Sequence, residues 1–226
     1  MDLILFDCDG TLVDSQNVIV STMTTAFGRH GLVPPSRDAV LGIVGLSLPI
    51  AISTLAPDLD EPALSEVVEA YKETYSDLRR DPSMTAPLYP GIRTALEVLA
   101  DRPDTLIGIV TGKSRRGLNA ILALHGLESF FSTLQTADDA PSKPHPAMVL
   151  QALAETGGAP ERTVVIGDTG FDMAMARAAG AAALAVPWGY HDADRLFAAG
   201  AQEIVSDHTD LVPGIERLLR CAPQVS

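Results

Sequence analysis

The chain opens with Met1-Asp-Leu-Ile-Leu-Phe-Asp7-Cys-Asp9-Gly-Thr-Leu-Val-Asp14. Its first six residues form a short apolar run of the kind found in buried strands. The run ends in two carboxylates one residue apart, Asp7 and Asp9, and Gly10 follows at once. Buried acids are rare in proteins unless they are paired or bind a metal. We therefore interpret residues 1–6 as a buried strand, and the two carboxylates at its carboxyl end as groups that hold a cation and supply a nucleophile.

Two simpler interpretations of this segment exist. Asp-Gly is a common turn dipeptide, so Asp9-Gly10 alone would indicate only that the strand ends. An EF-hand loop needs further oxygen ligands at alternate positions and a late Glu, but Gly10, Thr11 and Leu12 follow here. The EF-hand is excluded, and the cation site depends on whether other acids and a lysine converge on Asp7.

Composition limits the function classes. The 226 residues carry a net charge of −13, and 46% are hydrophobic but only 5% aromatic. The charge argues against nucleic acid and anionic membranes as partners, because both attract basic surfaces. No apolar stretch is long enough to span a bilayer, and the N-terminus has no signal-peptide pattern. Two distant cysteines and five histidines without paired spacing predict neither a disulfide framework nor a zinc site. We expect a reducing, cytoplasmic location.

The chain divides into two regions that differ in their predicted secondary structure. Residues 15–85 show helical patterns and no strand: Ser15 and Ser36 are candidate caps of the first two helices, and 48–56 and 62–80 are two more. From residue 86 onward, strand patterns at 105–110, 134–135, 163–167, 182–186 and 203–205 alternate with helical ones at 115–125, 146–155, 172–179 and 211–220. Such alternation predicts an α/β fold, a Rossmann-like parallel sheet with helices on both faces. We therefore expect a core of 1–14 and 86–226 and an inserted α-helical cap of 15–85.

Further polar residues follow the predicted strands, where open parallel sheets bind their ligands. Thr111 and Gly112 end the strand at 105–110, Asp168 and Asp172 follow the strand at 163–167, and Lys143 precedes a helix. Singly, each has an ordinary structural explanation: Asp168 as a helix N-cap, Asp172 in a first turn, Lys143 as a solvated loop charge. Gly112-Lys113-Ser114 resembles the end of a P-loop, but that motif needs glycine at position 107, where Ile107 stands, so a nucleotide-binding P-loop is excluded. Their joint occurrence at successive strand ends favours one site.

The ordered set Asp7-x-Asp9-Gly-Thr-Leu, Thr111, Lys143 and Gly-Asp168-x-x-x-Asp172 resembles the four motifs of the haloacid dehalogenase-like hydrolase superfamily. The likeness spans nearly the whole chain, and the helical insert resembles that family's small α-helical cap. Pro90-Gly91 before a helix and Trp188-Gly-Tyr190 are most similar to the phosphoglycolate phosphatase-like branch.

The chemistry of the acids points to magnesium. Four carboxylates around one pocket repel a phosphate monoester, and a hard divalent cation removes that conflict. The resemblance implies that Asp7 and Asp168 bind Mg²⁺ by their side chains and Asp9 by its carbonyl. It implies that Asp172 acts through water or steadies the site.

The resemblance also implies a phosphatase mechanism. Asp7 would attack phosphorus and form an aspartyl-phosphate, and Asp9 would serve as general acid and then general base. Thr111, the Gly112 amide and Lys143 would stabilise the phosphoryl oxygens. An Asp at position 9 speaks against dehalogenation, and the single cap lysine, Lys72, lies on a polar helix face and speaks against phosphonate hydrolysis.

The cap is expected to select the substrate. The segment 41–47 resembles the family's cap loop that faces the active site, and Arg29, Arg37, Arg79 and Arg80 are candidate partners for a second anionic group. We expect a small phosphorylated metabolite, with phosphoglycolate as the leading guess, and a monomer or homodimer. Two alternatives stay open: a phosphomutase of the same fold, and a non-catalytic phospho-ligand or regulatory protein.

Overall fold

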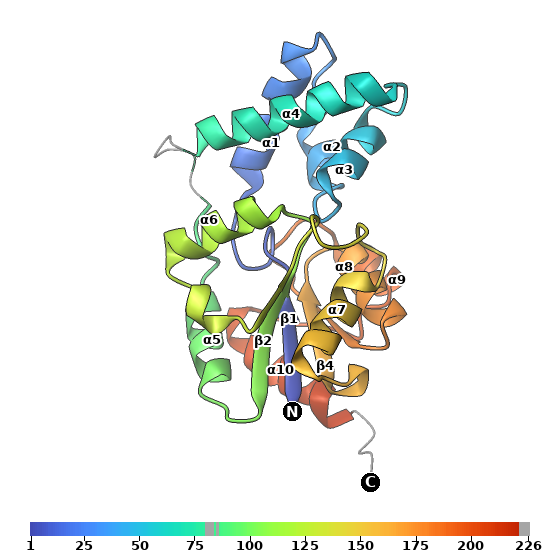
Figure 1. Ribbon diagram of the computed structural model, residues 1–226. Coiled ribbons are helices and arrows are strands. Elements are labelled where there is room, and N and C mark those ends of the chain that lie inside the picture. Colours follow the sequence, from blue (N-terminus) through green and yellow to red (C-terminus); the bar gives the residue numbers. More distant parts are fainter. Residues whose placement is uncertain (80–83, 85, 222–226) are drawn as a thin grey trace.

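The computed structural model describes residues 1–79, 84 and 86–221. Its centre is a six-stranded parallel sheet of order β3-β2-β1-β4-β5-β6 (Figure 1). The strands are β1 (Asp2–Phe6), β2 (Thr105–Val110), β3 (Thr133–Gln135), β4 (Thr163–Gly167), β5 (Ala182–Ala185) and β6 (Glu203–Ile204). The opening apolar run is therefore a central strand, flanked by β2 and β4, and the predicted α/β parallel-sheet fold is confirmed.

Alternation along β1 builds the two sides of the core. Ile4 and Phe6 pack into one hydrophobic cluster, while Leu3 and Leu5 pack into another. The first cluster lies against α5 (Ile92–Ala100), α6 (Arg115–His125) and α10 (Leu211–Cys221). The second lies against α7 (Ala147–Thr156), α8 (Gly170–Ala178) and α9 (Ala193–Ala198). Since both faces of the sheet are covered, its strands are apolar on both sides. Single-turn 3₁₀ helices η1 (Glu128–Phe130), η2 (Pro160–Arg162) and η3 (His208–Asp210) complete the core.

Four helices form the cap above the carboxyl ends of the strands (Figure 1). They are α1 (Gln16–Arg29), α2 (Arg37–Leu41), α3 (Leu48–Leu55) and α4 (Glu61–Leu78). They enclose a hydrophobic cluster of their own, with α1 and α4 packed along each other. The cap therefore has a small core that is separate from the two clusters around the sheet.

The two connections between core and cap run side by side. The amide of Asp14 donates to the carbonyl of Pro87 at 2.8 Å, and Val13 forms an antiparallel bridge with Leu88. The amide of Tyr89 donates to the Leu12 carbonyl at 3.0 Å. The chain thus enters and leaves the cap at one place.

Some local expectations need correction. Ser15 precedes α1, but no amide of the first turn donates to its side chain; its hydroxyl is directed at Asp9, to which it donates. Ser36 does cap α2, accepting from the Ala39 amide. The expected helix at 62–80 begins at Glu61, after the capping side chain of Asp60, and ends at Leu78; Arg80 and the tail at 222–226 lie outside the described residues. Helix α9 was not expected from the sequence. No helix in the described part of the chain is long and apolar enough to cross a membrane.

Candidate active site

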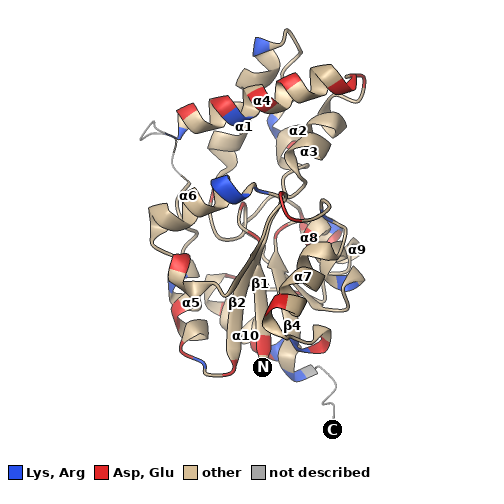
Figure 2. Cartoon of the chain, viewed as in Figure 1, with Lys and Arg blue, Asp and Glu red and all other residues tan. Residues whose placement is uncertain are grey.

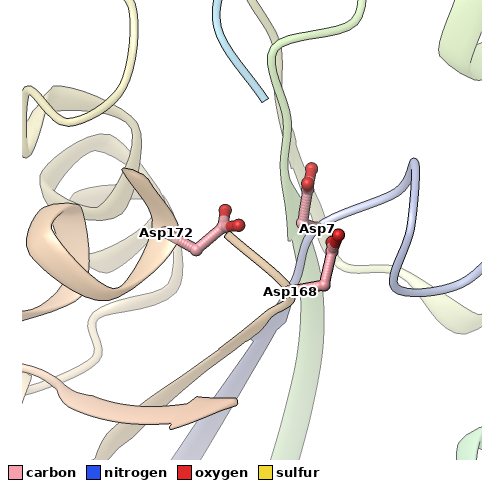
Figure 3. Close-up of side chains that lie close together, drawn as sticks. All are labelled: Asp7, Asp168 and Asp172. Carbon is pink, nitrogen blue, oxygen red and sulfur yellow. The ribbon is translucent and has the colours of Figure 1, made fainter. Parts of the chain in front are cut away.

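Three carboxylates meet beyond the carboxyl ends of the central strands (Figure 3). Asp7 follows β1, Asp168 follows β4, and Asp172 lies in the first turn of α8. One oxygen from each lies within 4.8 Å of the others, and all three residues are buried. The structure therefore brings together acids that are up to 165 positions apart in the sequence.

Local hydrogen bonds hold two of these acids. Asp168 accepts from the Thr11 hydroxyl at 2.8 Å and from the Tyr190 amide at 2.9 Å. Asp172 accepts from the amide and hydroxyl of Thr169, which is the true N-cap of α8 and forms a capping box with it. Asp168 is thus not the N-cap that its position suggested. Its oxygens stay directed toward the other acids instead.

Lys143 is buried among the acids. Its ammonium lies 2.9 Å from Asp7 Oδ1 and 2.5 Å from Asp172 Oδ1, and the residue is 1% exposed. Burial disfavours the charged ammonium, but Asp172 and Asp7 outweigh it and raise the pKa of Lys143 above its ordinary value. Lys143 is therefore not a solvated loop charge.

Asp7 is the least satisfied of the three acids. Apart from the ion pair with Lys143, neither of its oxygens accepts a hydrogen bond from the described residues. Burial raises its pKa from the ordinary 3.8 to about 6, against the opposing charge of Lys143. Burial and the neighbouring acids likewise raise the pKa of Asp168 well above its ordinary range. Three buried acids share one buried ammonium, so the oxygen ligands and the excess negative charge fit a hard divalent cation.

The Asp9 carboxylate lies outside this group of three. Its Oδ1 accepts from the Ser15 hydroxyl at 2.6 Å, and its Oδ2 lies 2.7 Å from the ammonium of Lys113. Asp9 and Asp7 both line a cavity between core and cap. The Asp7 carboxylate therefore belongs to the candidate metal site, whereas the Asp9 carboxylate lies at the cavity with Lys113.

Thr111 and Gly112 line the same cavity, at the end of β2. The Thr111 hydroxyl is buried and accepts from the Lys113 amide at 3.3 Å. A methyl group on Gly112 would overlap the backbone carbonyl of Gly45 in the cap loop. The predicted phosphate-binding residues thus lie directly below the cap.

The cavity has a volume of about 780 Å³ and is closed on one side by apolar cap residues, among them Ile19, Met23, Val44 and Leu48. Of the four arginines proposed from the sequence, Arg79 lines it. Arg29 and Arg37 are not among its lining residues, and Arg37 donates to Gln16 on the surface. Arg80 lies outside the described residues.

Sequence reasoning missed several contacts at the site. Lys113 was considered only as part of a P-loop, although its place two residues after Thr111 could have indicated a role. Ser15 was read only as a helix cap. Tyr75, whose hydroxyl lies 3.2 Å from Lys113, comes from the cap and gave no signal at all. Cys8 is a buried free thiol, and burial raises its pKa well above the ordinary value.

Comparison with known proteins agrees with this geometry. Residues 4–186 match the family described as haloacid dehalogenase-like hydrolase. A Dickeya dadantii protein named "Probable phosphatase IndB" is 34% identical over 220 residues, which cover 96% of this chain and 95% of that protein. Pyrophosphatase PpaX of Bacillus pumilus is 33% identical over 198 residues, covering 87% and 88%. A phosphoglycolate phosphatase of Haemophilus influenzae is 28% identical over 198 residues, covering 84% and 87%.

A solved structure gives the same assignment. A haloacid dehalogenase-like family hydrolase from Streptococcus pneumoniae superimposes with a TM-score of 0.80 at 29% identity, covering 94% of this chain and 97% of that one. The family match spans most of the chain, including the strand ends that carry Asp7, Thr111 and Asp168. The chain belongs to the haloacid dehalogenase-like hydrolase family.

Proposed function

We propose that this protein is a Mg²⁺-dependent phosphatase that hydrolyses a small phosphate monoester through an aspartyl-phosphate. The observation that carries the proposal is the position of Asp7, a buried carboxylate at the end of β1 that pairs with Lys143 and lines the cavity. The names of the relatives, a phosphatase, a pyrophosphatase and a phosphoglycolate phosphatase, support phosphoryl chemistry.

The reaction divides between Asp7 and Asp9. A carboxylate oxygen of Asp7 attacks phosphorus, the bond from phosphorus to the ester oxygen breaks, and Asp9 protonates the departing alkoxide. Asp9, now a carboxylate, takes a proton from a water molecule that attacks the phosphoaspartate. This second attack releases phosphate and restores both side chains.

Three further groups act on the phosphoryl oxygens. The Thr111 hydroxyl and the Gly112 amide come from the end of β2, and Lys143 comes from the loop before α7. Donors fixed in advance around the developing charge account for most catalysis of phosphoryl transfer. The contacts of Lys143 with Asp7 and Asp172 fix its ammonium in advance.

The metal completes the site. Asp7 and Asp168 would hold Mg²⁺ by their side chains, Asp9 by its carbonyl and Asp172 through water. When bound, the ion supplies positive charge that lets an anionic phosphate approach the acids. The unsatisfied oxygens of Asp7 support this assignment.

The substrate is a small phosphorylated metabolite, with phosphoglycolate as the first candidate. The cap covers the cavity and limits its size, and the protein would act in the cytoplasm as a monomer or homodimer. A phosphomutase is the second candidate, because the same acids could pass the phosphoryl group to a sugar hydroxyl instead of water.

The deciding experiment measures phosphate release by purified protein with Mg²⁺. The panel contains phosphoglycolate, pyrophosphate, sugar phosphates and an activated aryl phosphate, with isomerisation of the sugar phosphates followed in parallel. Net release supports the phosphatase, and isomerisation without release supports the mutase. If no compound gives either phosphate release or isomerisation, both enzyme proposals are refuted, and a non-catalytic binding protein is the remaining interpretation.

A further inference from the structure

Lys113 links the Asp9 carboxylate to the cap. Its ammonium lies 2.7 Å from Asp9 Oδ2 and donates to the Tyr75 hydroxyl at 3.2 Å. It also lies 5.0 Å from the centre of the Tyr75 ring. The side chains of Lys113 and Asp9 are only 8% and 10% exposed. This lysine belongs to the core, whereas Tyr75 belongs to α4 of the cap, so the contact exists only when the cap covers the site.

The ammonium has one donor left. A lysine ammonium carries three N–H groups, and in the described part of the chain Asp9 and Tyr75 are its partners. Lys113 also lines the cavity. A largely buried ammonium with a free donor beside a cavity favours an anionic acceptor from a bound ligand, because burying charge is costly unless it is paired.

Among the charged residues that line the cavity, cations outnumber acids by four to three. Apart from Asp7 and Asp9, the charged residues that line the cavity are Lys72, Arg79, Lys113, Arg116 and Asp138. The guanidinium of Arg79 lies 6.0 Å from the centre of the same Tyr75 ring and forms no ion pair within the described residues. This local excess of cations contrasts with the net charge of −13 and with the acidic residues that recur along α4 (Figure 2). The cavity wall above Asp9 is therefore built for an anion.

Position limits the ligand further. A general acid lies within hydrogen-bond reach of the oxygen that it protonates. Since Lys113 touches the same carboxylate, an oxygen held by its free donor lies roughly 3 to 6 Å from the ester oxygen. A carboxylate separated from the ester oxygen by one or two carbons has its oxygens within that range.

We propose that Lys113, Tyr75 and Arg79 form a subsite for a carboxylate on the leaving group. Lys113 is then the residue that determines substrate specificity. The substrate class is then the phosphate monoester of a small hydroxy acid. This inference rests on the proposed phosphatase activity. It assigns selectivity to a contact between a core loop and one cap helix.

The test compares two substrates of equal length, 2-phosphoglycolate and 2-hydroxyethyl phosphate, in which a hydroxymethyl group replaces the carboxylate. The wild-type protein is expected to prefer phosphoglycolate by about 10- to 100-fold in kcat/KM, the contribution of a charged hydrogen bond. Lys113→Met should reduce this ratio to about 1 to 3, mainly through a higher KM for phosphoglycolate. Lys113→Arg should restore part of it, because the positive charge returns.

Lys72→Met is the matched control. It removes one lysine charge from the cavity wall, but Lys72 pairs with Glu69 at 2.6 Å and is more than half exposed, so the ratio should not change. If Lys113→Met does not fold, Tyr75→Phe and Arg79→Met must each lower the ratio several-fold. The inference is overturned if the wild type does not prefer phosphoglycolate. It is also overturned if Lys113→Met, or both Tyr75→Phe and Arg79→Met, lower kcat/KM equally for the two substrates. If the protein releases no phosphate from these two substrates or from any other monoester, the proposed phosphatase activity itself is refuted.

Discussion

Gly112 of the core lies so close to Gly45 of the cap that a methyl group on Gly112 would overlap the Gly45 carbonyl oxygen. A second contact lies nearby, where the Ser47 amide donates to the Ser142 hydroxyl at 2.8 Å. The cap loop therefore rests directly on the loop that is proposed to bind phosphate. A lid in this position would exclude bulk water from the proposed covalent intermediate.

Gly112→Ala is expected to keep the cap from closing. The added methyl group would displace the Gly45 backbone, and a shift of about 1 Å in a catalytic site can cost about 100-fold in rate. We expect kcat/KM for phosphate release to fall about 10- to 100-fold, with little change in thermal unfolding. Gly28→Ala is the matched control, because a Cβ there would meet nothing within 4 Å. Unchanged kinetics in Gly112→Ala would contradict the closed arrangement as the active one.

Asp7→Asn should abolish turnover. An amide cannot form the phosphoaspartate, so phosphate release should fall by at least about 1,000-fold. Acid-quenched wild-type protein should carry a phosphoryl group on Asp7, detectable by mass spectrometry. Asp2→Asn makes the same change at the opposite end of β1 and should retain activity. Label on another residue would refute Asp7 as the nucleophile.

Lys143→Met should destabilise the metal-free protein. Removing the ammonium leaves Asp7 and Asp172 buried without their cation, and breaking a buried ion pair costs about 3 to 5 kcal/mol. Chemical denaturation in EDTA measures this loss. Adding Asp172→Asn to the variant should recover part of the stability, since one uncompensated charge disappears. A double variant as unstable as the single one would indicate that lost packing, not charge, is the cause.

Magnesium should stabilise the fold as well as support activity. A ligand that binds only the native state adds about 2.7 kcal/mol at 100 times its Kd. We expect the unfolding midpoint to rise with Mg²⁺ concentration and EDTA to stop phosphate release reversibly. Asp168→Asn should lose the Mg²⁺-dependent rise, whereas Asp210→Asn, far from the three acids in the sequence, should keep it. An equal rise in both variants would argue against Asp168 as a ligand.

The metal-free protein should lose stability as the pH rises through the range of Asp7. Burial raises the pKa of Asp7 from 3.8 to about 6, so between these values the folded state binds more protons than the unfolded state. Stability then falls with rising pH, by about 3 kcal/mol for this group over the full range. Because other acids titrate too, the measured quantity is the difference in unfolding free energy between wild type and Asp7→Asn in EDTA. That difference should shift in favour of the variant between pH 4 and pH 7, and a constant difference would contradict the prediction.

The strands and the convergence of Asp7 and Asp168 could be predicted because both depend on short patterns. The apolar runs before Asp7 and Asp168 mark buried strands, and parallel strands place their carboxyl ends at one edge. Lys143 needed the family's ordered motifs as well, since a single lysine in a loop has no periodicity. The contact of Lys113 with Asp9 and Tyr75 depends on how the cap packs on the core. No local pattern encodes that packing, because Tyr75 is 38 residues from Lys113.

Two side-chain caps were assigned wrongly for a related reason. Serine is a common N-cap residue, but the hydroxyl of Ser15 is directed at the Asp9 carboxylate and donates to it at 2.6 Å. Likewise Thr169, not Asp168, caps α8, because the Thr11 hydroxyl and the Tyr190 amide hold the Asp168 side chain. In both cases, hydrogen bonds within the candidate site outweigh the local preference of the residue for capping a helix.

The paired crossing at Val13 and Leu88 has an evolutionary consequence. Because both ends of the insert meet at one point, a helical module of different length or sequence could replace it without altering the register of β1 with β2 and β4. New substrate preferences could then arise by exchange of a whole module while the hydrolytic machinery is inherited unchanged. Grafting the segment that corresponds to residues 15–85 from a relative with another preference would transfer that preference in a single step.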